Sequence, residues 1–461
     1  MTKFNTRYIF SISMVSAMGG LLFGYDWVVI GGAKPFYEQF FNIAESPALQ
    51  GWAMSSALIG CLLGAIISGV LSDRLGRKRL LMFAAFLFIF SAFGTGASRV
   101  YDWFIFYRIL GGVGIGLASN LSPMYIAEIS PAAVRGKFVS LNQLTIVIGI
   151  LLAQLANWQI AQPVAPSATD AEILASWNGQ TGWRWMFWAE TVPAGLFFVL
   201  MFFVPESPRW LAKNGNASRV EHILSKIGGW EYAKTEYLNI RETLATEKGK
   251  VNFRHLFEPG MKKILLIGIV IAAFQQWCGI NVIFNYAEEV FEAAGYGVSD
   301  ILFNIVLTGS VNLVFTFVAL YTVDKLGRRA LLLLGAGGLA GIYAFMGAAY
   351  YFQVTGWPLL LLVVIAIACY AMSLAPVTWV VLSEIFPNKI RGAAMAVATI
   401  SLWLASFLLA YTFPLLNDLL GASGTFWLYG VICVAGFIFI YRKLPETRGK
   451  SLEEIEHEIV Q

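Results

Sequence analysis

The sequence predicts an all-α membrane protein of twelve transmembrane helices, arranged as two six-helix halves with short cytoplasmic helices between the halves. Three observations predict this class: the composition, the number of long apolar segments, and a repeat of three sequence signals. Hydrophobic residues make up 58% of the chain and charged residues 13%, whereas soluble domains carry about 25% charged residues. The mean hydropathy is +0.67. We therefore expect a polytopic protein whose surroundings are the lipid bilayer and whose partners include no nucleic acid.

The apolar segments are long enough to cross a bilayer, for which a helix needs roughly 20 residues. They fall near residues 8–30, 51–71, 80–97, 103–124, 138–158, 184–204, 264–284, 302–323, 330–352, 357–382, 394–415 and 424–441. A polar interval separates the sixth from the seventh. The predicted parts are an N-terminal six-helix bundle over 1–205, a cytoplasmic helical linker over 206–262, a C-terminal six-helix bundle over 263–443 and a cytoplasmic tail over 444–461.

Lys and Arg gather on one side of this arrangement, beside both termini and after every second span. The loops of the opposite side hold few basic residues, among which we place Lys34. Basic loops stay in the cytoplasm, so both termini are predicted to be cytoplasmic. The first apolar run is too long for a signal-peptide core, so we expect it to stay attached. The outer loops lack N-glycosylation sequences, which favours a bacterial inner membrane.

Three signals occur once in each half at nearly constant spacing. The matched signals are Asp73–Lys78 with Asp324–Arg329, Glu128 and Arg135 with Glu384 and Arg391, and Pro205–Ser207 with Pro445–Thr447. Such an internal repeat of six helices is typical of secondary transporters. The sequence therefore predicts two related bundles that move against each other.

Asp26 is a lone carboxylate within the first apolar run. A carboxylate inside a membrane helix costs at least ~2.5 kcal/mol, so we expect Asp26 to face a partner or water rather than lipid. The alternative is a position near the headgroups at a helix end. Glycines surround Asp26 in the sequence, and they let neighbouring helices approach closely.

Polar side chains inside the spans are the candidates for a substrate site, because such transporters bind their substrate near the midplane between the halves. Amides both donate and accept hydrogen bonds, which suits a polyol, and an indole offers an apolar face together with an N–H. The alternative is that these groups only bond helices to one another. The candidates are Gln143, Gln275, Gln276, Asn281, Asn312 and Trp379.

Charged residues at the cytoplasmic helix ends are candidates for a gate. Charge-assisted hydrogen bonds between the halves would hold this side closed. The alternative is that the basic residues only set the topology. The gate candidates are Asp73, Arg77, Glu128, Arg135, Asp324, Arg328, Glu384 and Arg391, with Glu128–Arg391 and Glu384–Arg135 as possible pairs between the halves.

The motifs and their order resemble the sugar porter family of the major facilitator superfamily over nearly the whole chain. They are GYD at Gly24–Asp26, DRLGRK at Asp73–Lys78, PESPRWL at Pro205–Leu211, QQWCGIN at Gln275–Asn281, DKLGRR at Asp324–Arg329, SEIFPNKIRG at Ser383–Gly392 and PETRGKS at Pro445–Ser451. The chain is most similar to bacterial proton–xylose symporters and more distantly similar to facilitative glucose transporters. The resemblance implies the major facilitator fold, a pentose or hexose substrate, function as a monomer, and neither cofactor nor metal.

The resemblance also implies roles for single residues. It places the amides and Trp379 named above in the sugar site, together with Phe23 and Trp403. Asp26 matches the acid of the proton-coupled members, and facilitative members usually have Asn there. Arg108 matches the basic partner of that acid and Glu190 an accessory acid. Separation of Asp26 from Arg108 would favour proton binding, and their reunion would favour release.

Two positions depart from the family pattern. Leu402 stands where the xylose symporters carry a sugar-binding Gln, and Asn285 stands where the family usually has Tyr. These departures leave the sugar open. The resulting prediction is a proton-coupled sugar symporter that works by alternating access, with a facilitative uniporter of the same fold as the alternative. Three other functions are less well supported. Sodium coupling and drug export would need further acids in the spans, and a membrane enzyme would need catalytic motifs that the sequence lacks.

Overall fold

The computed structural model describes residues 4–165, 168–246, 256, 258, 260–387, 391–448, 450, 454 and 458–459, without the side chains of residues 246, 324 and 391. In this part of the chain, eleven helices are long and apolar enough to cross a membrane. The last of them, α18 (Arg391–Lys443), contains the non-helical Gly421, with φ 66° and ψ 173°. Since only glycine adopts such a backbone readily, α18 consists of two spans, and the twelve predicted spans are present.

The two halves contain the same series of long helices. The first half comprises α1 (Thr6–Phe40), α2 (Pro47–Leu75), α3 (Arg77–Ala97), α4 (Tyr101–Ile129), α5 (Arg135–Ile160), and η1 (Asn178–Gly182) with α7 (Trp183–Ala189) and α8 (Thr191–Phe203). The second comprises α11 (Met261–Trp277) with α12 (Ile280–Asn285), α14 (Val298–Leu326), α15 (Arg328–Tyr351), α16 (Trp357–Ala371) with α17 (Leu374–Ile385), and α18. The prediction of an all-α membrane fold is confirmed.

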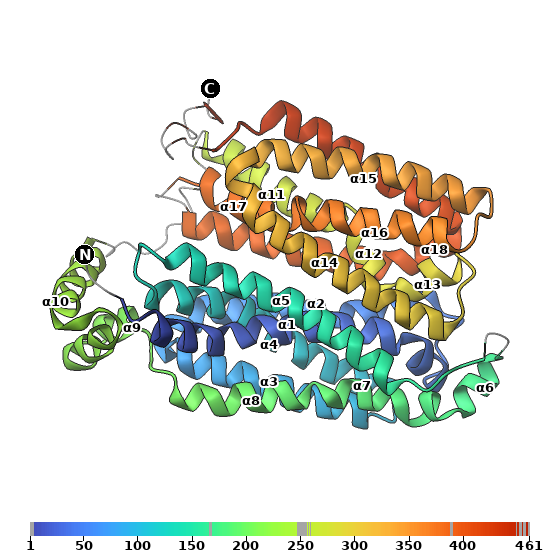
Figure 1. Ribbon diagram of the computed structural model, residues 1–461, viewed down its shortest axis with the longest axis horizontal. Helices are drawn as coiled ribbons and strands as arrows, with labels where there is room; N and C mark the ends of the chain where they lie inside the picture. The colour runs from blue at the N-terminus through green and yellow to red at the C-terminus, as the bar shows by residue number, and fades with distance from the viewer. Residues whose placement is uncertain are drawn as a thin grey trace.

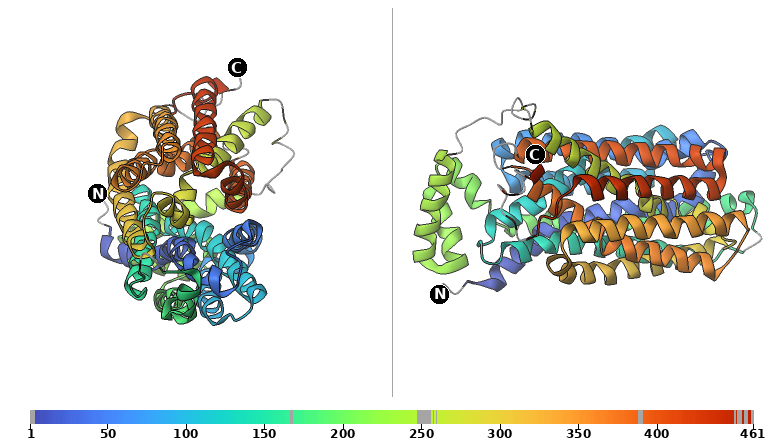
Figure 2. Two further views of the ribbon diagram at one scale, coloured as in Figure 1. Left: turned by 90° about the vertical axis from the view of Figure 1, so that its right-hand side faces the viewer. Right: turned by 90° about the horizontal axis from the view of Figure 1, so that it is seen from above.

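The halves lie side by side, with the first half in blue to green and the second in yellow to red (Figure 1). An end-on view separates them into two bundles (Figure 2). Both termini lie at one end of the molecule, with α9 (Pro208–Lys213) and α10 (Ala217–Thr246). We name this the termini end. The short helix α6 (Asp170–Ala175) lies at the opposite end, the α6 end.

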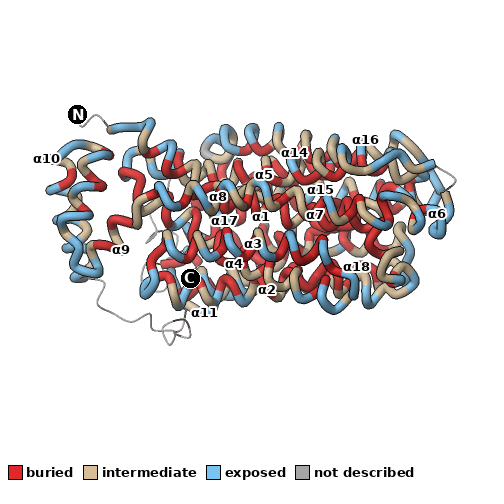
Figure 3. Tube along the Cα trace, turned by 90° about the horizontal axis from the view of Figure 1, so that it is seen from below, coloured by how far each residue is buried: buried red, intermediate tan, exposed pale blue. Residues whose placement is uncertain are grey.

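Buried residues run along the facing sides of the long helices, and exposed residues alternate with them on the outer sides (Figure 3). Close helix packing depends on glycine where α1 crosses α5. A Cβ at Gly24 would lie 1.9 Å from the backbone oxygen of Ile146, and a Cβ at Gly149 would lie 1.9 Å from that of Leu21. The predicted close approach of backbones beside Asp26 is therefore present in the structure.

The first helix is longer than predicted. The apolar run near 8–30 continues as α1 through Pro35 to Phe40, and Lys34 and Glu38 are both buried in it. Lys34, which we placed in an outer loop, is therefore part of the transmembrane helix. The reason is that Lys34 forms ion pairs with Glu38 and with two acids of the other half, and paired charges do not have to end a helix in water.

Candidate functional site

A chain of amide side chains lies on α11 and α12, where the helix is interrupted at Gly279. Asn281 Nδ2 donates to Gln276 Oε1 at 2.6 Å, and Gln276 Nε2 donates to Gln275 Oε1 at 2.5 Å. Gln275 Nε2 donates to the Tyr370 hydroxyl of α16 at 2.6 Å. All three amides are buried. In the structure they bond to one another, and each also has further donor or acceptor capacity for a polar ligand.

Tyr370 is the one member of this chain that the sequence analysis missed. Its hydroxyl lies near the end of the strongly apolar helix α16. A tyrosine that interrupts such a run was the available signal, because a buried phenol normally has a hydrogen-bond partner.

Three aromatic rings meet where α1 of the first half faces α18 of the second. The ring of Trp403 lies 5.9 Å from that of Phe23 and 6.2 Å from that of Trp27, measured between centroids. Trp403 is 4% exposed, and its indole Nε1 has no hydrogen-bond partner within the described residues. Trp27 was missed in the sequence analysis, although it directly follows Asp26. The cluster thus presents apolar ring faces and one unused donor at the boundary between the halves.

The remaining sugar-site candidates are more scattered. Asn285 is buried on α12, and its Oδ1 has no partner among the described residues. Asn312 on α14 and Leu402 on α18 are buried as well. Gln143 on α5 is partly buried, and Trp379 on α17 is 36% exposed. The structure therefore bonds only Gln275, Gln276 and Asn281 to one another.

An ion pair joins Asp26 of α1 to Arg108 of α4 in the interior of the first half. Arg108 Nη1 donates to Asp26 Oδ1, and Nη2 contacts the backbone oxygen of Asp26 at 3.4 Å. Both residues are 2% exposed. Asp26 lies in the middle of the 35-residue helix α1, which excludes the alternative of a headgroup position at a helix end.

Several buried polar atoms around this ion pair have no hydrogen-bond partner within the described residues. Within the described residues, Asp26 Oδ2, Arg108 Nε and Glu190 Oε1 are buried and lack a hydrogen-bond partner. Glu190 is 1% exposed and sits where α7 meets α8. The Arg108 guanidinium also lies 5.8 Å from the centre of the Phe187 ring. The interior of the first half thus holds two acids and one guanidinium whose hydrogen-bonding capacity is partly unused within the described residues.

The charged motif of the first half forms a network at the termini end. Arg77 pairs with Glu128 at 2.8 Å and with Asp73 at 3.3 Å. The other oxygen of Glu128 accepts from the Ser207 hydroxyl. Glu206 accepts from the backbone N–H groups that begin α3. Burial raises the pKa of Glu206 above its usual value, although these N–H groups oppose the shift.

The second half repeats this network with its matched residues. Arg328 pairs with Glu384 at 3.1 Å, and the Thr447 hydroxyl donates to Glu384 at 2.6 Å. Glu446 accepts from the backbone N–H groups at the start of α15. Burial opposes ionisation of Glu446, but the backbone N–H groups outweigh it and hold its pKa below the usual value. The repeat seen in the sequence is thus a repeated hydrogen-bond pattern.

The acids of the two possible pairs between the halves, Glu128 and Glu384, have other partners in the described part of the chain. Glu128 and Glu384 each bond to partners of their own half. Arg135 is exposed and makes no hydrogen bond or ion pair with the described residues. The side chains of Asp324 and Arg391 lie outside the described part of the chain. In the described part of the chain, Arg77 and Arg328 of the same bundles occupy these two acids.

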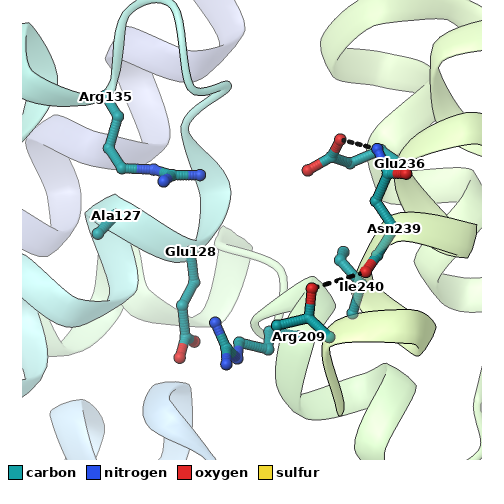
Figure 4. Close-up of a pocket in the computed structure, with 8 residues that line it drawn as sticks. Ala127, Glu128, Arg135, Arg209, Glu236, Asn239 and Ile240 are labelled. Atoms are coloured by element: carbon teal, nitrogen blue, oxygen red, sulfur yellow. Dashed lines mark hydrogen bonds between the residues drawn. The ribbon is translucent and has the colours of Figure 1, made fainter. Parts of the chain in front are cut away.

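A cavity of about 350 Å³ opens at the termini end between the first half and the linker helix α10. Arg135 and Glu128 line it from the first half, Arg209 lines it from α9, and Glu236, Asn239 and Ile240 line it from α10 (Figure 4). Arg135 therefore faces solvent-filled space rather than the second half.

Contacts between the halves lie toward the α6 end. Lys34 of α1 pairs with Glu288 and Glu289 of α13 (Ala287–Glu292). The backbone N–H of Val164 donates to the Ser299 hydroxyl at 2.9 Å. Ring pairs also cross the boundary there, namely Trp52 with Phe407 and Trp158 with Phe303. This distribution describes a molecule that is closed at the α6 end.

Known proteins resemble this chain over nearly its whole length. The family model "Sugar (and other) transporter" matches residues 12–459. The chain is 42% identical to the D-xylose-proton symporter of Escherichia coli (strain K12), over 99% of this chain and 96% of that protein. It is 39% identical to the arabinose-proton symporter of Bacillus subtilis (strain 168), over 97% and 94% respectively.

Solved structures of sugar transporters also resemble this chain. The inward open conformation of the xylose transporter XylE from E. coli matches with a TM-score of 0.85 and 38% identity, over 98% of this chain and 100% of that one. The proton:xylose symporter XylE bound to 6-bromo-6-deoxy-D-glucose matches with a TM-score of 0.78 and 40% identity, over 98% and 99%. The resemblance to the sugar porters is confirmed, and the chain belongs to the sugar transporter family of polytopic membrane proteins.

Proposed function

We propose that this chain is a proton-coupled symporter that imports a monosaccharide by alternating access. The observation that carries the proposal is the buried ion pair between Asp26 and Arg108, with Glu190 as a second buried acid. Burying these charges costs free energy even when they are paired, so the ion pair favours a proton-coupled carrier over a facilitative one. The relatives named as proton symporters support the same conclusion.

The pair offers a simple coupling cycle. In the present conformation Arg108 contacts Asp26. A movement of α1 against α4 that separates them leaves Asp26 in a dry site, where the protonated acid is the more stable form. Oδ2 of Asp26 already lacks a partner among the described residues, so it is the atom that we assign to the proton.

The sugar site in this proposal is the amide chain of Gln275, Gln276 and Asn281, with the ring cluster of Phe23, Trp27 and Trp403 beside it. Amides recognise hydroxyl groups and ring faces pack against sugar C–H groups. The free donor of Trp403 and the free acceptor of Asn285 are further contacts for hydroxyls. Gln143, Asn312, Trp379 and Leu402 complete the proposed site. We propose a pentose or hexose as substrate.

The proposal includes an orientation and a setting. The termini end is assigned to the cytoplasm, because basic residues gather there. The α6 end then faces outward, the gate residues of both networks lie at the cytoplasmic face, and the present conformation is open to the inside. We place the chain in a bacterial inner membrane as a functional monomer, with the residue ranges 1–205, 206–262, 263–443 and 444–461 as its parts.

Uptake in proteoliposomes tests the function. The purified chain is reconstituted, and the uptake of labelled pentoses and hexoses is followed with and without an imposed pH gradient, acidic outside. We expect one sugar to accumulate above its external concentration only when the gradient is present. Uptake that stops at equal concentrations under every gradient would instead establish the alternative, a uniporter.

A further inference from the structure

Lys34 is a buried cation with three carboxylate partners. Its Nζ lies 2.9 Å from Glu38 Oε2, 3.1 Å from Glu288 Oε2 and 2.9 Å from Glu289 Oε1. The Lys34 side chain is 3% exposed. Glu38 belongs to the same helix as Lys34, whereas Glu288 and Glu289 belong to α13 of the other half.

This cluster stabilises contact between the halves rather than either half alone. Burying charges costs hydration free energy that an ion pair does not always recover, so a buried ion pair is weak evidence for a purely stabilising role. Here the ion pairs span the boundary between α1 and α13 at the α6 end. Several groups are also left without a partner in the described residues, namely Glu38 Oε1, Glu289 Oε2 and the Tyr37 hydroxyl. The cluster therefore combines three ion pairs to Lys34 with three buried polar atoms that have no hydrogen-bond partner within the described residues.

We infer that Lys34 closes an outer gate, by holding Glu288 and Glu289 of the second half against α1 whenever the outer side of the transporter is shut. The inference rests on the proposed function for its direction, since outside means the α6 end. It adds a gating residue that neither the proton site nor the sugar site contains.

Glu38 gives Lys34 a partner in both states of such a gate. When the halves separate at the outer side, the contacts to Glu288 and Glu289 must break, because those residues move with α13. The contact between Lys34 and Glu38 lies within one helix, four residues apart, and survives the movement. Lys34 is therefore never left as an unpaired charge, and opening only exposes the two acids of α13 to water.

Titration of the α13 acids supports a gate that responds to external pH. Burial raises the pKa of Glu289 to about 7, although Lys34 opposes the shift. With the gate open the same carboxyl is hydrated and returns toward its ordinary value near 4.5. The closed gate thus holds a proton more tightly, so acid favours closure, and this preference is lost as the pH rises through about 7. The titratable groups that face the cluster are Tyr37, Glu38, Tyr101, Asp170, Tyr286, Glu288 and Glu292.

Distances across the outer side test the gate directly. Spin labels are attached at Leu49 of α2 and Leu419 of α18, which are both exposed and belong to different halves, after the four native cysteines are replaced. Double electron–electron resonance on the full chain in nanodiscs then reports open and closed populations. We expect Lys34→Met to raise the ratio of open to closed at least tenfold. Above about pH 7 the isosteric Glu289→Gln, which is neutral like the protonated acid, should instead lower this ratio.

Glu38→Gln is the matched control. It removes an ion pair of the same lysine at the same distance, but within one half. Because it leaves Lys34 without its partner in the open state, the open population should fall rather than rise. A wild-type series from about pH 5 to about pH 8 should show the closed population falling, and Glu289→Gln should flatten that series. Unchanged distances in both Lys34→Met and Glu289→Gln, or equal opening by Glu38→Gln, would overturn the inference. Loss of pH-driven uptake in the unmodified chain would contradict the proposed function alone, because these distances do not depend on coupling.

Discussion

Asp26→Asn should separate sugar movement from proton movement. The change removes one charge and keeps the volume of the side chain, so the packing of α1 against α4 and α5 is preserved. Arg108 then keeps a neutral partner that cannot release a proton. We expect the variant to exchange sugar across the membrane and to lose the ability to concentrate it.

The size of the effect follows from the gradient and from the burial of the pair. A pH difference of about two units stores about 2.7 kcal/mol per proton, enough for roughly 100-fold accumulation if one proton accompanies one sugar. The variant should reach a ratio near one. Removing one member of a buried ion pair costs about 3–5 kcal/mol of stability, and both residues here are 2% exposed. A lower unfolding temperature is therefore also expected.

Two measurements on the same preparation give the answer. Counterflow exchange, in which unlabelled sugar inside drives labelled sugar in, reports a folded and moving carrier. Accumulation under the pH gradient reports coupling. The conservative control is Asp26→Glu, which keeps the acid and should retain part of the accumulation. If Asp26→Asn still concentrates sugar to the level of the unmodified chain, Asp26 is not the proton carrier and the reasoning from the buried pair is wrong.

The other predictions concern the gate and the sugar site. Arg135→Gln should favour the inward-facing state by about tenfold or more. Arg135 has no hydrogen-bond partner within the described residues, and bonds that it forms only when the cytoplasmic side closes, worth about 1.5–3 kcal/mol, would be lost in the variant. Accessibility of single cysteines on the two faces measures this shift. Leu402→Gln should improve the affinity for D-xylose relative to other sugars by one to two decades, since a sugar hydroxyl buried against Leu402 costs about 1–3 kcal/mol. An unchanged ranking of sugars in competition assays would place Leu402 outside the site. Tyr370→Phe should weaken sugar binding several-fold without affecting pH dependence, because Gln275 loses the partner that orients it; equal dissociation constants for the variant and the unmodified chain would count against the amide chain as the site.

Most of the fold could be predicted because each span is a long apolar run, and the repeat fixed the number of runs in each half. The ends of the helices were harder to predict from the sequence. Lys34 and Pro35 together are normal signals for the end of a helix, yet α1 continues to Phe40. The continuation depends on acids 254 and 255 residues later in the chain, which no local pattern contains.

The candidate site, like the fold, could be predicted only in part. Polar residues inside apolar runs are visible in the sequence, so the amides and the lone acid of α1 could be found. Which of them bond to each other depends on how the helices pack. Tyr370 joins the amide chain only because α16 lies against α11, and Trp27 joins the ring cluster only because α18 faces α1. The gate residues show the limit most clearly, since their motif predicts charge pairs but not whether the partner lies in the same half.

Asp26 and Lys34 lie on one continuous helix, eight residues apart, which is about 12 Å along the helix axis. One faces Arg108 within its own half, and the other faces Glu288 and Glu289 across the boundary. A displacement of α1 large enough to separate Asp26 from Arg108 therefore also changes the distance between Lys34 and α13. Because each contact biases the position of the same helix, we propose that protonation at Asp26 and opening at the α6 end are linked through α1 itself.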